Sequence, residues 1–159
     1  MNGSKGFVLS EMGHVVQALA PVDITGGKTG QAFSMKNYKH ASILVLIGAS
    51  AAAFTKILVN ACTDAAGDGA AAIPFEIYTQ ETAAGDVLSA RTDVAAAGYT
   101  PSANDGIFYV IEIDSAELPQ GSPYVQVQLT NGANSVIAAV VAVLSGARFA
   151  EPQSPTEIV

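Results

Sequence analysis

The chain has 159 residues, the length of one domain, and its formal net charge of −7 combines 14 acidic with 7 basic side chains. This balance argues against a nucleic-acid-binding surface, which needs clustered Lys and Arg. Charged residues make up only 13% of the chain, against about 25% in an ordinary soluble domain, so we expect other copies or a partner to cover part of the surface.

The first 30 residues are expected to form an N-terminal arm outside the main domain. A helical turn is predicted within "VLSEMGHVVQAL" (8–19), and Pro21 and three glycines then disfavour regular structure. This region lacks the sustained apolar core of a signal peptide, so we expect the protein to be made in the cytoplasm. His14 and His40 have no second His or Cys at metal-ligand spacing, which favours a surface or core-edge position for both.

The apolar stretch "ASILVLIGASAAAFTKILVNACT" (41–63) suits a membrane span, a buried helix or two strands. A span needs about 20 apolar residues, whereas Gly48, Ser50 and Lys56 interrupt this stretch. Residues 54–63 alternate with period two, and residues 42–48 form a short apolar run typical of a buried strand. The stretch therefore predicts two strands and a loop, with no membrane association.

The single cysteine, Cys62, excludes an internal disulfide and a multi-cysteine zinc site. Free cysteine is among the most buried residue types. We therefore expect Cys62 to be a small core residue rather than a reactive thiol.

The remaining strands are predicted by runs rich in Val, Ile, Tyr and Phe, separated by Gly, Asn, Asp and Pro segments. With the two strands above they make about eight: residues 31–35, 73–80, 86–92, 107–114, 124–130 and 135–145. No helical pattern intervenes. We therefore predict an all-β fold, an antiparallel β-sandwich or jelly roll over residues 31–148, with residues 149–159 as a C-terminal tail.

The run "YVQVQLT" (124–130) alternates most clearly, with Val125, Val127 and Leu129 predicted to point inward. The turn sequence "TNGAN" follows it directly and precedes the last strand. Residues 124–145 are therefore predicted to form a hairpin.

The last strand is apolar on both of its faces, although a sandwich strand needs only one apolar face. The second face must be covered, either by another chain or by the protein's own arm. Residues expected to contact another copy or a partner lie in the arm, in this strand and just after it: Val15, Val16, Leu19, Val136, Ile137, Val140, Val141, Arg148 and Phe149.

No catalytic, cofactor-binding or metal-binding residues are predicted. Asp64 and Asp68 lie in a glycine-rich turn that offers oxygen ligands for calcium, but the spacing of a calcium loop is lacking and a plain turn is favoured. Glu112 and Asp114 share one side of a strand about 7 Å apart, a separation suited to acid–base chemistry. A solvated strand end is the favoured interpretation, and we predict that the protein is not an enzyme.

Four segments resemble small structural proteins of tailed bacteriophages that are encoded among head genes and regarded as capsid decoration, or cement, proteins. The resemblance extends over residues 14–149, and its segments are "ALAPVDITGGKTGQAFSMKNYKHASILVLIGA", "ILVNACTDAAGDGAAAIPFEIYTQ", "IFYVIEID" and "VIAAVVAVLSGARF". It implies a β-sandwich subunit, commonly trimeric, on the outside of the expanded head.

The implied partners are the major capsid protein and further copies of the chain, and the implied location is the exterior of the virion. No catalytic residue comes with this resemblance. The alternatives are another β-sandwich component of the virion, in the neck or tail, and a carbohydrate-binding module that uses exposed aromatics such as Tyr99 or Tyr124.

Overall fold

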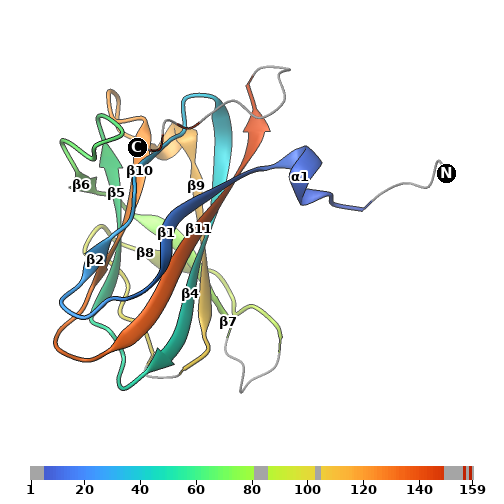
Figure 1. Cartoon of the computed structure of the whole chain (residues 1–159). Helices are drawn as coiled ribbons and strands as arrows, with labels where there is room; N and C mark the ends of the chain where they lie inside the picture. Colours follow the sequence, from blue (N-terminus) through green and yellow to red (C-terminus); the bar gives the residue numbers. More distant parts are fainter. Residues whose placement is uncertain (1–5, 81–85, 103–104, 149–155, 157, 159) are drawn as a thin grey trace.

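The computed structural model describes residues 6–80, 86–102, 105–148, 156 and 158. Two antiparallel sheets pack face to face, as the strand patterns predict (Figure 1). The six-stranded sheet has the order β1-β11-β4-β9-β7-β8. The five-stranded sheet has the order β2-β10-β5-β6, and β3 also pairs with β10.

The strands of the six-stranded sheet are β1 (His14–Asp23), β4 (Tyr38–Ser50), β7 (Phe75–Gln80), β8 (Thr92–Val94), β9 (Phe108–Asp114) and β11 (Val136–Ala147). Those of the five-stranded sheet are β2 (Lys28–Thr29), β3 (Phe33–Ser34), β5 (Lys56–Cys62), β6 (Ala71–Ala72) and β10 (Tyr124–Thr130). A one-turn helix, α1 (Leu9–Met12), precedes β1, and a 3₁₀ turn (Ser115–Glu117) follows β9.

Eight of these strands form two sets of four, β1-β11-β4-β9 and β2-β10-β5-β6. The chain passes from one sheet to the other at most of its connections, which is the winding of a jelly roll. β7 and β8 extend the first sheet beyond β9. The predicted all-β sandwich is confirmed, and the stretch 41–63 consists of most of β4, a loop and all of β5.

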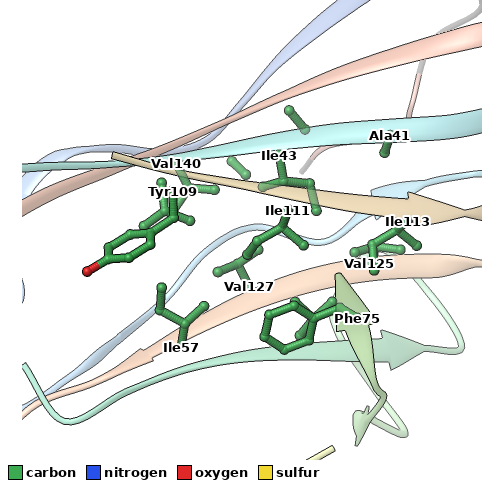
Figure 2. Close-up of a cluster of buried hydrophobic side chains, with 14 of the residues drawn as sticks. Ala41, Ile43, Ile57, Phe75, Tyr109, Ile111, Ile113, Val125, Val127 and Val140 are labelled. Atoms are coloured by element: carbon green, nitrogen blue, oxygen red, sulfur yellow. The ribbon is translucent and has the colours of Figure 1, made fainter. Parts of the chain in front are cut away.

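The core fills the space between the sheets. Figure 2 shows Ile43 and Ile111 of the six-stranded sheet directed toward Val127 and Ile57 of the opposite sheet. All four side chains are 0% exposed. Burying one side chain of this size stabilises the fold by roughly 1.5–3 kcal/mol, so the alternating apolar residues of the two sheets are the main source of stability.

Residues 124–145 do not form the predicted hairpin. β10 pairs with β2, β3 and β5, whereas β11 pairs with β1 and β4 in the other sheet. The segment between them is a corner in which Asn131 Nδ2 donates to the carbonyls of Asn134 (2.8 Å) and Ile24 (3.3 Å). Turn residues of this kind suit a corner as well as a hairpin, so the local sequence does not reveal which strand is the partner.

The predicted boundary of the N-terminal arm at residue 30 is wrong. Residues 14–23 form β1, which pairs with β11, and Val16 and Ala18 alternate into the core with 3% and 2% exposure. β11 ends at Ala147. Of the predicted arm, the described residues that precede the sandwich are residues 6–13.

The strand predicted over residues 86–92 is displaced to β8. Val87 and Leu88 are 78% and 42% exposed, so these two apolar residues of the predicted strand do not belong to the core. The backbone nitrogen of Ser89 donates to the Thr79 carbonyl at 2.8 Å. This bond holds Ser89 beside β7, although residues 86–91 are not part of a strand.

Asp23 ties the end of β1 to the corner before β11. Its carboxylate accepts hydrogen bonds from Ser135 Oγ (2.6 Å), Thr25 Oγ1 (2.7 Å) and the nitrogens of Thr25 (2.9 Å) and Val136 (3.3 Å). The bonds from the Ser135 and Thr25 side chains, followed by that from the Thr25 backbone, lower the pKa of Asp23 from 3.8 to about 2.

We expect Asp23→Asn to lower the stability at neutral pH and to remove part of the acid sensitivity. Because the folded-state pKa lies below the unfolded value, the carboxylate stabilises the fold above pH 3.8, and this contribution is lost as the pH falls toward 2. Urea unfolding of both proteins across this range should show their difference shrinking as the solution becomes more acidic. A difference that does not change with pH would contradict this role.

Candidate interaction surface

The outer face of the six-stranded sheet is apolar over much of its area. We define the outer face by seven residues that alternate with core residues along β1, β4, β9 and β11: Val15, Leu44, Leu46, Val110, Ile137, Val141 and Val143. Val15, Leu46 and Ile137 are 49%, 40% and 38% exposed, and the other four are half-buried. The strand register places Val141 beside Leu44, and Leu44 beside Val110, in one row. An exposed apolar face of this kind is a candidate surface for protein contacts.

A second apolar surface lies at the beginning of the chain. The N-terminal segment, residues 6–12, includes α1 and projects from the sandwich in Figure 1. Phe7, Leu9 and Met12 are 69%, 40% and 58% exposed, and no residue of α1 is buried. Isolated helices shorter than about 12–15 residues are marginal in water. Packing against another surface would therefore stabilise α1.

The segment leaves the sandwich next to the outer face. A Cβ atom built on Gly13 would lie 2.9 Å from Val143 Cγ1 and 3.3 Å from Leu9 Cδ1. The lack of a side chain at Gly13 therefore lets the chain pass close to β11 before it projects. The two apolar surfaces adjoin at Val143.

The structure divides the residues that the sequence assigned to contacts. Val16, Val136 and Val140 are 3%, 0% and 0% exposed, so these three predictions are wrong: the residues belong to the core. Leu19 is half-buried against the same core. Val15, Ile137 and Val141 lie on the outer face, and their contact with another chain stays a prediction. Arg148 is exposed, and Phe149 lies outside the described residues.

One end of the outer face is polar because β4 and β9 bring three ionisable side chains together. His40 Nδ1 lies 2.7 Å from Asp114 Oδ1, and His40 Nε2 lies 2.7 Å from Glu112 Oε2. Ser42 Oγ donates to the same Glu112 oxygen at 2.7 Å. Sequence analysis identified both carboxylates but missed His40 as their partner, because the β4–β9 register that aligns them is not a local signal.

The environment of His40 favours its protonated form. Partial burial by itself would lower the pKa, but hydrogen bonds to Asp114 and Glu112, together with the negative charges of both carboxylates, raise the pKa above 6.5. Glu112 and Asp114 therefore act as partners of a cation on the outer face.

Arg148 lines a cavity of about 390 Å³ at the end of the sandwich, together with Met35, Lys36, Leu118 and Pro119 among others. Its Nη2 donates to Ser115 Oγ at 2.8 Å. Beside this cavity the Ser34 nitrogen donates to the Thr156 carbonyl at 3.1 Å, and Thr156 is 4% exposed. At Thr156, the predicted C-terminal tail therefore lies against β3.

The acidic turn at residues 64–68 closes on itself. Asp64 Oδ1 accepts from the Asp68 nitrogen at 3.0 Å, and the Asp68 carbonyl accepts from Thr63. Among the described residues, no group of three His, Cys, Asp or Glu side chains is placed to hold a metal ion. Cys62 is 0% exposed as predicted, and burial, together with the negative charge of Asp64, raises the pKa of its thiol.

The two tyrosines considered for sugar binding do not form an open platform. Tyr124 is 3% exposed, and Tyr99 packs against the core with its ring edge-on to Tyr109 at 5.6 Å. Sugar rings usually stack on exposed aromatic faces. No helix in the described part of the chain is long and apolar enough to cross a membrane.

Comparisons with known proteins give a likeness of structure and none of sequence. No protein-family model matches the chain, and no curated protein matches its sequence. The structure is similar to the crystal structure of the SPBc2 prophage-derived protein YomS, with a TM-score of 0.47 and 11% sequence identity. The match covers 89% of this chain and 100% of that one. At this level the likeness carries no functional implication.

Proposed function

We propose that the chain is a structural protein of a tailed-phage virion that binds the outside of the head as an oligomer and stabilises the mature capsid. The sequence resemblance over residues 14–149 suggests this role. The observation that carries it is the projecting N-terminal segment, whose Phe7, Leu9 and Met12 are exposed. Such a segment is suited to binding a neighbouring subunit.

The outer face supports the same proposal. Leu44, Leu46 and Val141 form an apolar patch of a kind that usually marks a protein contact. In the proposed assembly the outer face contacts another copy of the chain, while the N-terminal segment reaches the capsid. Many such contacts, each weak, would act together through multivalency.

Stabilisation of the capsid follows from selective binding. A protein that binds only the expanded lattice shifts the equilibrium toward that lattice by the free energy of binding. No catalytic step is needed. The low share of charged residues agrees with a subunit that is partly covered in its working state.

The test combines light scattering with co-sedimentation. The full-length protein is first measured alone for its mass and then mixed with expanded, undecorated heads made from the major capsid protein of the same phage. We expect an oligomer, a trimer by the resemblance, that pellets with expanded heads in numbers comparable to the capsid subunits. Unexpanded heads serve as the control and should bind less.

Two results would contradict the proposal. A monomer that stays in the supernatant would remove both the oligomer and the attachment. Binding of only a few copies per particle would favour the neck or tail of the virion instead.

A further inference from the structure

His40 is the only described side chain whose two ring nitrogens each face a carboxylate at 2.7 Å. A neutral imidazole has a single N–H group, and an ionised carboxylate only accepts hydrogen bonds. Two short bonds to Glu112 and Asp114 therefore require a ring that carries both protons. The contacts join β4 to the C-terminal end of β9 on the outer face.

The charged groups around this contact come from several elements. On β7, Glu76 is the register partner of Glu112, and Arg91 Nη1 pairs with the Glu76 carboxylate at 2.9 Å. Arg91 also contacts Asp93 of β8 at 3.2 Å. No cation other than His40 lies within ion-pair distance of Glu112 or Asp114 among the described residues.

The remaining neighbours of His40 do not supply a replacement cation. In the 3₁₀ turn, Glu117 accepts from the Asp114 nitrogen at 2.9 Å and adds a negative charge. On β11 the register partner of His40 is the uncharged Ser145. Arg148, which follows β11, donates a hydrogen bond to Ser115. On β4 itself, the adjacent Lys39 makes no ion pair in the described part of the chain.

We propose that His40 is an imidazolium clamp that holds Glu112 and Asp114 to β4, and that loss of its proton releases this end of the outer face as the pH rises. With the proton in place, two carboxylates and one imidazolium sum to −1; without it they sum to −2. The neutral ring keeps a single N–H and so only one of its two hydrogen bonds. The carboxylate that loses its bond is then held near a second negative charge without a cation between them, which favours its movement away from β4.

The clamp makes the outer face sensitive to pH. Because the folded-state pKa of His40 is raised, its contribution to stability is complete below pH 6.5 and is lost as the pH rises through the folded-state value. If the proposed function is correct, association of the copies through the outer face weakens over the same pH range, since the more negative polar end of this face is harder to bury. That consequence rests on the proposed function, whereas the clamp itself does not.

The test follows the histidine rings of the isolated full-length protein by NMR from about pH 5 to about pH 9, the range in which histidine titrates. The chain has two histidines, so His40→Gln assigns the signals. We expect the His40 ring to titrate above 6.5, with a lower midpoint in Asp114→Asn. A wild-type midpoint at or below 6.5 would overturn the clamp.

Thermal unfolding gives an independent readout. The unfolding temperature of the wild-type protein should exceed that of His40→Gln at slightly acidic pH, and the difference should vanish at alkaline pH. A difference that is constant with pH would show that His40 only fills space. Neither measurement uses phage heads, so a failed clamp leaves the attachment proposal intact, and failed co-sedimentation leaves the clamp intact.

Discussion

Replacing Ile43 by Ala is expected to lower the free energy of unfolding by about 2–5 kcal/mol, whereas Leu44→Ala on the same strand should cost about 1 kcal/mol or less. Ile43 is 0% exposed and points into the core toward Val127 (Figure 2). Its truncation leaves a cavity between the two sheets, which the close-packed core fills only in part. Leu44 points to the outer face, where water can occupy the space.

The two variants should separate folding from attachment. Urea unfolding of each variant measures stability, and light scattering with co-sedimentation measures assembly. Ile43→Ala should lose stability and keep its attachment where it remains folded, while Leu44→Ala should keep its stability and assemble or attach about tenfold more weakly, the effect of losing part of one buried leucine. Equal losses of stability in both variants would show that the outer face is covered within the subunit.

The strands that could be predicted are those whose pattern is local. In β10 every second residue is apolar, and Val125, Val127 and Leu129 are each 0% exposed as expected. The limits of β10 also agree with the predicted run 124–130. Period two and β-branched composition suffice here because one face meets the core and the other is polar.

Partners in space could not be predicted in the same way. β1 was missed because Pro21 lies within it and because a glycine-rich stretch follows, and its true partner, β11, is more than 100 residues away. The assignment of β10 and β11 to different sheets depends on the winding of the whole chain. The His40 contacts depend on the register of β4 and β9, which brings residues about 70 positions apart into contact.

The last strand shows why some of the predicted contact residues are buried in the core. Both faces of β11 are apolar, and the sequence does not reveal which one faces the opposite sheet. The structure assigns Val136 and Val140 to the core and leaves Ile137 and Val141 outside. Alternation separates the residues of β11 into two faces, and only the position of the opposite sheet decides which face is buried.

Deleting residues 1–12 is expected to leave a folded subunit that attaches to expanded heads about 100-fold more weakly. β1 begins at His14, so the deletion removes α1 without shortening the sheet, whereas a cut after residue 20 would remove most of β1. Phe7, Leu9 and Met12 are largely exposed in the subunit and contribute little to its stability. If two of them are buried on the head at roughly 1.5 kcal/mol each, their loss corresponds to this change in affinity.

A full-length control distinguishes the side chains from the length of the chain. Phe7→Ser combined with Met12→Ser keeps the segment and removes two of its apolar groups, so its attachment should be weakened nearly as much as in the deletion. The unfolding temperature of both variants should match that of the wild type, since neither residue is buried in the subunit. Undiminished attachment of the deleted protein would place the capsid contact elsewhere. The outer face would then be the surface to alter, because Leu46 and Ile137 are also exposed apolar residues.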